Sequence, residues 1–581
     1  MIRTIGIVGC GPRGLSAVES LCLEIAGRDG APALSVHVFE ATGTPGAGPV
    51  YDPEQSRQNW LNVADRQLDL PARKPVTVYG IAVPGFPGFR DHVGPDATQA
   101  SPDTPDHYST RALLGQYLHA RFVSLADAFR QSDFLTIHHD TVIDVESVGS
   151  GLVIKTVAGV QLPVDELVLA AGHQPTEPDA QLAQWLRGVA GSDTHICFAD
   201  PYPVEPICES VRRTANAGVA LRGFGLSMID VMKNLSEGLG GQFVRSSRRE
   251  TALKYQASGC EPRLIVPFSL DGLPMAPKPL NKRIDDLYVP EEKDANSFTR
   301  EVSDALAEVG QGRVHAQLIE SMAGVAASVF SRLGDRAWPS TESASTIARW
   351  CADYLLDPDT PNDALILRSE STAKMIDDFV QMACGLAPVS LDYCLGQVWH
   401  HLQPSLYTLL SYAVQDADLM AELVALNERM KRYAFGPPVT SMERLLALHQ
   451  AGILDLDLVQ DPEISMSDSG WRLRHNGRSE QVGIMINTVL DSTAVSDVCS
   501  PLFKVMLNTG LVQPSHPDLG IRIQPDATAG EESSTDSAPI AILGRLAQGS
   551  LVGVDSIHAC FDNRQDRWAR GVLARAMQRR H

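Results

Sequence analysis

A glycine-rich turn near the beginning of the chain constrains its fold more than any other feature. Residues 4–8 are typical of a short buried strand, residues 9–14 carry the motif G-x-G-x-x-G, and residues 15–25 show helical apolar spacing. Such a strand–turn–helix unit lets backbone approach a pyrophosphate while the helix amino end faces the anion. The opening therefore predicts a dinucleotide site, built on Gly9, Gly11, Pro12 and Gly14.

A carboxylate at the end of the next predicted strand indicates the type of nucleotide. Residues 35–39 are typical of a second strand, and Glu40 follows it directly. A carboxylate roughly 20 to 30 residues beyond the glycines suits hydrogen bonds to both hydroxyls of an unphosphorylated adenosine ribose. Glu40 is therefore expected to bind that ribose.

The same strand–turn–helix–strand order is predicted again in the middle of the chain, with positive instead of negative charge after the second strand. Residues 219–222 predict a strand, 223–227 a turn, 228–235 a helix and 242–244 the next strand, which is followed by arginines. A guanidinium there accommodates the 2'-phosphate of NADPH, whereas an incidental basic turn is the alternative. The predicted second site consists of Gly223, Gly225, Ser227, Arg245 and Arg248.

The length of 581 residues predicts three or four domains. After the second nucleotide unit the pattern is predominantly helical, and strand composition returns in the C-terminal part, where Gly544 and Gly549 follow a buried strand. We expect an α/β fold with two Rossmann-like dinucleotide-binding domains and a helical insertion. The predicted boundaries are 1–199 for the first part of the FAD-binding domain, 200–289 for the NADPH-binding domain, 290–454 for the helical insertion and 455–581 for the completion of the FAD-binding domain.

Composition and charge exclude several classes of partner. The formal net charge of -21 disfavours a nucleic-acid backbone or an anionic membrane. A strand directly after Met1 leaves no room for a signal peptide, and no apolar run reaches the roughly 20 residues of a membrane helix. Ten cysteines without a C-x-x-C pair argue against a metal site. We expect a cytoplasmic protein; the sequence leaves self-association open.

Three further residues lie at or near the predicted nucleotide sites. Gly172 follows a buried strand at 164–170 and lets the chain leave the sheet beside the first nucleotide site. The neighbouring His173 is better explained as a hydrogen-bonded loop residue than as a catalytic base. Asp230, one turn into the second nucleotide helix, is expected to be a solvated or capping acid.

Several strings resemble the FAD/NAD(P)-binding flavoprotein family that includes nitrosuccinate synthases, flavin enzymes that oxidise the amine of aspartate. They are GCGPRGL from Gly9, GAGPVY from Gly46, GHQP from Gly172, GFGLSMID from Gly223 and SGCEP from Ser258. The resemblance implies FAD on the first glycine turn and Glu40, and NADPH on the second. It also implies that Gly46, Gly48, Asn62, Gly172, Gly544 and Gly549 lie near the flavin.

Two residues test that resemblance. Asn62 looks like the asparagine held beside the reacting flavin in related monooxygenases, and its alternative role is a turn cap. Many such flavoproteins carry Gly-Asp where this chain has Gly544-Arg545, the aspartate binding a ribityl hydroxyl. Either another residue replaces that aspartate here or flavin is held more weakly.

The resemblance implies an N-monooxygenase that uses FAD, NADPH and O2 to oxidise the amine of a small, aspartate-like amino acid through a flavin hydroperoxide. An amino-acid substrate needs a cation for its carboxylate, and the candidates are Arg57, Arg66, Arg73 and Arg263. Two alternatives remain: a flavin dehydrogenase or C-oxygenase of another small molecule, and a catalytically silent dinucleotide-binding regulatory protein, for which Arg545 is the best argument.

Overall fold

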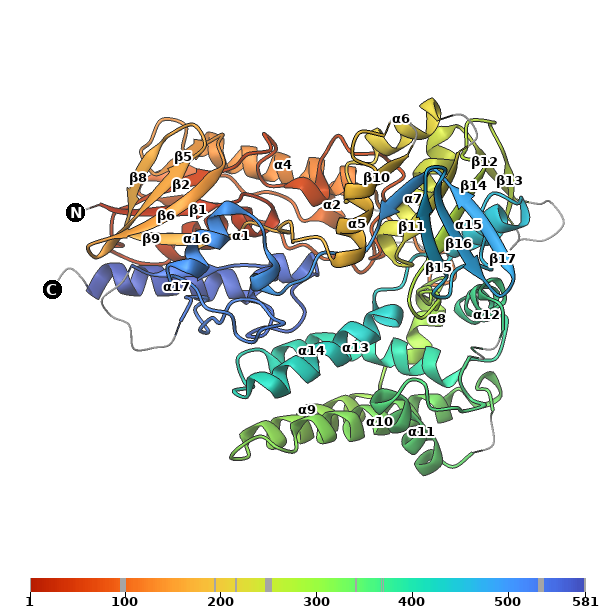
Figure 1. Ribbon diagram of the computed structural model, residues 1–581. Coiled ribbons are helices and arrows are strands. Elements are labelled where there is room, and N and C mark those ends of the chain that lie inside the picture. The colour runs from red at the N-terminus through yellow and green to blue at the C-terminus, as the bar shows by residue number, and fades with distance from the viewer. Residues whose placement is uncertain are drawn as a thin grey trace.

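The computed structural model is an α/β protein with two parallel sheets and a separate body of helices (Figure 1). It describes residues 2–94, 101–192, 195–214, 217–245, 253–339, 342–366, 368, 370–530 and 538–578. The α/β class with parallel sheets, expected from the two glycine-turn units, is confirmed.

Five parallel strands form the first sheet, in the order β19-β9-β1-β2-β5. β1 is central because Ile7 pairs with Val38 of β2 on one side and with Val168 of β9 on the other. Helix α1 (Pro12–Ala26) follows β1, and α17 (Asn563–Gln578) packs beside it. The strands are β1 Arg3–Val8, β2 Leu34–Phe39, β5 Leu135–His138, β9 Glu166–Leu169 and β19 Ile540–Ile542.

The edge strand β19 comes from the far end of the sequence. Ala541 of β19 pairs with Val168 of β9, and both side chains are fully buried. Figure 1 shows this C-terminal part, in dark blue, against the red and orange N-terminal part. Residues from both ends of the chain therefore build one sheet and one hydrophobic core.

The second sheet has four parallel strands in the order β10-β18-β11-β14. They are β10 Ile196–Phe198, β11 Gly218–Arg222, β14 Leu264–Phe268 and β18 Ile484–Asn487. Helix α7 (Leu226–Ser236) follows β11, so the strand–turn–helix order of the first unit is repeated.

Two strands of this sheet correct predicted domain boundaries. β10 lies within 1–199, which the sequence assigns to the first part of the FAD-binding domain, yet it pairs with β18 of the second sheet. β18 lies within 455–581, which the sequence assigns to the FAD-binding domain, yet Met485 pairs with both Ala220 of β11 and Cys197 of β10. The antiparallel strands β15 (Glu463–Ser467), β16 (Gly470–His475) and β17 (Arg478–Val482) pack on the same sheet. Residues 455–487 thus pack with the second sheet and not with the first. The sequence did not reveal this, because a buried apolar strand has the same composition in either sheet.

The strand expected at residues 242–244 is present but lies elsewhere. β12 (Gln242–Arg245) pairs antiparallel with β13 (Leu253–Gln256) in a two-stranded ribbon. The place beside β11 is taken by β14, where Ala220 pairs with Val266. In the first unit the strand after the helix joins the sheet, whereas in the second unit the corresponding strand, β12, lies outside it.

The helical body has seven main helices in its described residues. The apolar run 406–430, which resembles one helix, is divided between α13 and α14, with Tyr412 at φ 65° in the break. Asp416 begins α14 because its carboxylate accepts a hydrogen bond from the Leu419 amide, 2.9 Å away. The helices are α9 Glu292–Ala307, α10 Val314–Arg332, α11 Ala344–Leu356, α12 Thr372–Ala383, α13 Leu391–Leu410, α14 Ala417–Ala434 and α15 Val439–Gln450.

The remaining elements are shorter or peripheral. Among the described residues, no helix combines the length and the apolar character needed to cross a membrane. The helices are α2 Phe89–Val93, α4 Arg111–Ala128, α5 Ala180–Gly188, α6 Glu205–Arg213, α8 Lys282–Asp285 and α16 Pro501–Asn508; the strands are β3 Val76–Val78, β4 Ile81–Val83, β6 Val142–Val148, β7 Gly151–Thr156 and β8 Gln161–Val164.

Candidate active site

A pocket of about 360 Å³ opens at the carboxyl edge of the first sheet. Ligands of parallel α/β sheets bind at this edge, beyond the ends of the strands. Loops that are distant in sequence converge on the pocket. Its lining includes Gly9, Gly11, Pro12, Arg13, Glu40, Gly48, Gly172, His173, Arg545 and Asp555.

The first glycine turn shows which glycines the protein itself requires. Gly9 has φ 90°, and a Cβ there would lie 2.5 Å from the Ala170 carbonyl oxygen; one on Gly14 would lie 2.4 Å from the Gly9 oxygen. A Cβ on Gly11 would meet nothing closer than 3.8 Å. Gly11 faces the pocket, so its missing side chain leaves room for a ligand instead of a neighbouring chain segment, and the turn fits a bound pyrophosphate.

Glu40 follows β2 and lines the same pocket with 4 % of its surface exposed. Its carboxylate accepts hydrogen bonds from the Thr42 amide at 3.1 Å and the Thr42 hydroxyl at 2.8 Å. These bonds orient the carboxylate, which fits the expected contact with ribose hydroxyls.

The loop after Glu40 packs back onto the glycine turn. A Cβ on Gly48 would lie 3.1 Å from the Gly11 Cα, and one on Gly46 would lie 2.4 Å from the Leu118 oxygen of α4. Gly48 lines the pocket, whereas Gly46 allows the loop to approach α4. Gly549, also expected near the flavin, is not among the pocket-lining residues; its absent Cβ makes room for Ser515 and Leu519.

The unexpected Arg545 has a carboxylate partner inside the pocket. Its Nε donates to Asp555 Oδ1 at 3.1 Å, while Lys431 Nζ donates to Asp555 Oδ2 at 2.5 Å. Burial opposes ionisation of Asp555, but the two cations outweigh it and hold the pKa of this carboxyl well below its usual range. Gly544, at φ 134°, places this segment against the Arg13 side chain.

His173 is a neutral side chain of the pocket wall. Burial and the nearby Arg545 lower its pKa to about 4. An uncharged imidazole there leaves Asp555 with Lys431 and Arg545 as its cationic partners.

In the second glycine turn, as in the first, the first glycine has no room for a Cβ and the middle glycine does. Gly223 has φ 116°, and a Cβ there would lie 2.8 Å from the Thr488 hydroxyl oxygen at the end of β18. A Cβ on Gly225, which caps α7, would have no neighbour within 4 Å. The middle glycine is again open, as in the first turn, while Ser227 is buried in the first turn of α7.

Arg245 lies at the end of β12 and is 54 % exposed. Its guanidinium is 3.5 Å from Glu443 of α15, so a carboxylate of the helical body already contacts the cation expected to bind a 2'-phosphate. Arg248, the other arginine of that prediction, lies outside the described residues.

Asp230 is neither solvated nor a cap, contrary to the sequence-based expectation. It is 3 % exposed and pairs with Arg111 of α4 at 2.8 Å and with Lys233 at 3.1 Å. Tyr202 donates its hydroxyl to the same carboxylate at 2.8 Å. This buried network joins the first nucleotide unit to α7 of the second.

The arginines proposed for substrate recognition are mostly engaged in other contacts. Arg73 pairs with Glu19 at 3.2 Å in the core, and Arg263 pairs with Glu480 at 3.3 Å on the surface. Arg57 is exposed. Arg66 is held by Asp106 at 2.7 Å and by Asp285 at 2.8 Å, so its charge is already compensated.

Asn62 connects the first domain to the helical body. Its side-chain amide donates to the Phe435 carbonyl, 3.1 Å away, just beyond the end of α14. The structure thus gives Asn62 a definite partner, and its proximity to a bound flavin stays a prediction.

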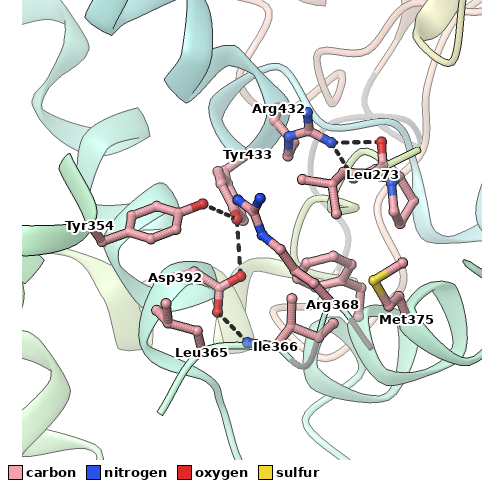
Figure 2. A pocket seen from close by; sticks show the side chains of 11 residues that line it. Leu273, Tyr354, Leu365, Ile366, Arg368, Met375, Asp392, Arg432 and Tyr433 are labelled. Carbon is pink, nitrogen blue, oxygen red and sulfur yellow. Dashed lines mark hydrogen bonds between the residues drawn. The ribbon is translucent and has the colours of Figure 1, made fainter. Parts of the chain in front are cut away.

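Of two other cavities, one adjoins the site and one lies apart from it. A pocket of about 590 Å³ adjoins the first through Arg545 and Asp555, and also contacts residues 490–493, which follow β18. Figure 2 shows a cavity of about 20 Å³ in the helical body, where Asp392 accepts from Tyr433 at 2.9 Å. The latter has room for about one water molecule and is too small for an amino acid.

Sequence reasoning missed three charged residues near the site: Lys278, which is buried, and Lys431 and Asp555, whose side chains are each 18 % exposed. Each lies outside a recognisable motif, and its neighbours come from distant segments. Among the described residues no cluster of His, Cys, Asp and Glu is arranged to hold a metal ion.

Comparison with known proteins agrees with this geometry. Residues 6–174 match the model of the FAD-NAD(P)-binding family. The chain is 26% identical to an L-aspartate N-monooxygenase (nitrosuccinate-forming) of Streptomyces davaonensis, over 87% of this chain and 85% of the relative. It is also 26% identical to a nitrosuccinic acid synthase of Aspergillus oryzae, over 88% of this chain and 82% of the relative.

A solved structure of cyclohexanone monooxygenase aligns with 100% of this chain and 88% of its own, at 11% identity and a TM-score of 0.45. The family match and the two relatives confirm the resemblance drawn from the motifs. They also confirm the expected cofactor class, FAD with a nicotinamide dinucleotide.

Proposed function

We propose that the protein is an FAD- and NADPH-dependent monooxygenase that oxygenates the amine nitrogen of a small acidic amino acid, aspartate or a close analogue. The observation that carries the proposal is the pair of open middle glycines, Gly11 and Gly225, in two successive strand–turn–helix units. Two relatives that align with most of this chain are named for nitrosuccinate formation, one of them also for aspartate N-oxygenation.

In this proposal the two parallel sheets are the cores of two Rossmann-like dinucleotide-binding domains, and the helical body is an insertion in the second. The first domain consists of residues 1–195 and 488–581, and the second consists of 196–289 and 455–487, since β10 pairs in the second sheet. Residues 290–454 form the insertion, whose α14 lines the pocket beside Asp555.

FAD would be held by the first unit. The amino end of α1 and the backbone at Gly9, Gly11, Pro12 and Gly14 bind the pyrophosphate, while Glu40 accepts hydrogen bonds from the adenosine ribose. Asp555 supplies the carboxylate that position 545 lacks, since it lines the same pocket. Gly48 and Gly172 let backbone approach the cofactor.

NADPH would be held by the second unit. Gly223, Gly225 and Ser227 form the phosphate turn. Arg245 binds the 2'-phosphate once its ion pair with Glu443 has broken. The 590 Å³ pocket extends from Arg545 and Asp555 of the flavin pocket to residues 490–493, which follow β18 of the second sheet; its lining does not include the phosphate turn or Arg245.

When bound, the two cofactors supply the hydride and the activation of O2, so that one oxygen atom enters the amine and the other leaves as water. The chain binds and orients the reactants and excludes water from the reacting end. Asn62 acts as a positioning residue there, because its hydrogen bond to the Phe435 carbonyl holds the first domain against the helical body. Because His173 is neutral, Lys431 and Arg545 remain the cationic partners of the ionised Asp555.

Anaerobic and aerobic assays of the purified protein test the proposal. We expect a yellow protein that NADPH bleaches without air, and an N-oxidised product from aspartate, detected by mass spectrometry, once air is admitted. Bleaching without an N-oxidised product from any amino acid in a panel would favour a flavin dehydrogenase or C-oxygenase. A colourless protein that takes up no FAD would favour the silent regulatory alternative.

A further inference from the structure

A cluster of polar and charged side chains lies between the first domain and the helical body. Most of its charges are matched: Asp285 lies 2.8 Å from Arg66 and 3.1 Å from His401, and Arg66 also pairs with Asp106. Lys278, on the segment that leads into α8, is different.

The ammonium group of Lys278 is buried without an acidic partner. Its side chain is 6 % exposed, and Nζ donates to the Ala434 carbonyl at 3.2 Å and lies 3.5 Å from His400 Nε2. In the part of the chain that the structure describes, no carboxylate is within ion-pair distance of Nζ. An unpaired buried cation is costly, and burial lowers the pKa of Lys278 to about 8.

Further hydrogen-bond donors beside Lys278 also lack partners. His400 is neutral because burial lowers its pKa well below the usual range, so an Nε2 that accepts from Lys278 leaves the proton on Nδ1. No hydrogen bond of normal geometry reaches that Nδ1, although the Gln403 side chain lies near enough to act on the pKa of His400. The amide nitrogen of Gln403 and both amide atoms of Gln397, on the same helix α13, are also unpartnered, and Gln397 is fully buried. Gln397 lies three residues before His400 and therefore on the same face of α13.

This cluster of unpartnered polar atoms adjoins the flavin pocket. His558 lies between Ile557 and Cys560, both of which line that pocket, and burial together with the charge of Lys278 lowers the pKa of His558. The Lys278 amide donates to the Pro437 carbonyl at 3.0 Å, two residues beyond the Phe435 carbonyl that Asn62 contacts. Lys278 and Asn62 thus hold the same short segment.

We propose that Lys278, together with His400 Nδ1, binds a carboxylate of the amino-acid substrate. The inference rests on the proposed function and deepens it, since it replaces the four arginines first considered with a cation that lacks a counter-ion. A carboxylate would supply the counter-ion that Lys278 lacks and an acceptor for His400 Nδ1, and the paired Arg66–Asp285 group would form the wall beside it. The substrate amine is then free to face the flavin.

A purely structural role for Lys278 makes a different prediction. Nζ lies at the carboxyl end of α14, where a lysine stabilises the helix through the last carbonyls. Lys278→Gln keeps a donor for Ala434 but removes the charge, and Lys278→Arg keeps the charge. Lys282→Gln is a matched control, because Lys282 is exposed and pairs only locally with Asp286.

The experiment uses the flavin-loaded protein and two ligands: L-aspartate as substrate, and succinate, a dicarboxylate without an amine, as inhibitor. For Lys278→Gln we expect the KM of aspartate and the Ki of succinate to rise about 10- to 100-fold, the range of one charge-assisted hydrogen bond. Lys278→Arg should retain most of the binding of both ligands, and Lys282→Gln should match the wild type.

Unchanged KM and Ki in Lys278→Gln would overturn the inference, as would a fall in melting temperature and flavin content that accounts for the whole effect. A wild type that makes no N-oxidised product from aspartate would instead contradict the proposed function. The Kd of succinate for the flavin-loaded protein, measured by calorimetry, would still report on the anion site in that case, so the two failures are distinguishable.

Discussion

Arg545 Nε donates a hydrogen bond to Asp555 Oδ1 across 3.1 Å, so the cation that stands where related flavoproteins carry an aspartate is neutralised by an aspartate ten positions later. Lys431 of α14 contacts the other carboxylate oxygen. The pocket therefore retains a carboxylate, and the strongest sequence argument for a silent protein is removed.

Asp555→Asn should weaken flavin binding about tenfold, because it removes an ionised acceptor and leaves Lys431 and Arg545 without their partner. The Kd of FAD for the deflavinated protein, followed by flavin fluorescence, measures this change. Glu428→Gln is the control, since Glu428 also pairs with Lys431 at 2.6 Å but does not line the flavin pocket. Equal losses in both variants would assign the effect to Lys431.

Gly11→Ala should fold and yet lose flavin. Its Cβ meets no protein atom closer than 3.8 Å but enters the pocket. Absorbance of bound flavin and the melting temperature of the apo-protein separate the two effects. Gly14→Ala is the contrasting variant, because its Cβ would lie 2.4 Å from the Gly9 oxygen and should destabilise the fold itself. Normal flavin content in Gly11→Ala would place the pyrophosphate elsewhere.

Arg245→Ala should raise the KM of NADPH about 10- to 100-fold and leave the KM of NADH unchanged, because only NADPH carries the 2'-phosphate. Glu443→Gln should lower the KM of NADPH by a factor of up to about five, since it frees Arg245 from a competing carboxylate. Steady-state oxidation of both cofactors measures these changes. Equal effects on NADH and NADPH would remove Arg245 from the phosphate site.

Asp230→Asn should destabilise the protein by about 3 kcal/mol, because Arg111 and Lys233 would remain buried without their carboxylate. Urea unfolding followed by tryptophan fluorescence is the measurement. Asp286→Asn, which breaks an exposed pair with Lys282, should change stability by less than about 1 kcal/mol. Similar values for the two variants would show that the Asp230 network contributes little.

The pH dependence of substrate capture should report on Lys278. Burial lowers its pKa from the usual 10.5 to about 8, so the charge that binds a carboxylate is present below pH 8 and is lost above it. The ratio of kcat/KM for Lys278→Arg to that of the wild type should therefore rise above pH 8, because arginine stays protonated. The facing groups Asp285, Asp106 and Arg66 keep their charges and His400 stays neutral there. A ratio independent of pH would contradict this assignment.

Local signals made parts of this molecule predictable. Each glycine turn lies directly between the strand and the helix that give it its function, as at 9–14 and 223–225, and Glu40 directly follows a strand. A short stretch of sequence therefore contains each of these motifs whole. The place of β18 was not predictable, because Ile484 and Ile486 would suit the interior of either sheet. Lys278 and Asp230 have no local signature: their environments are created by His400, Ala434 and Arg111, which tertiary packing brings to them.

The pairing of β19 with β9 determines when the first sheet can be completed during translation. A ribosome must translate residues 1–541 before Ala541 can dock beside Val168, and Asp555 of the pocket wall is made later still. Until then the nascent N-terminal half has an unpaired sheet edge, which exposes it to aggregation and to chaperones. We therefore expect flavin loading in the cell only after residue 555 has been translated.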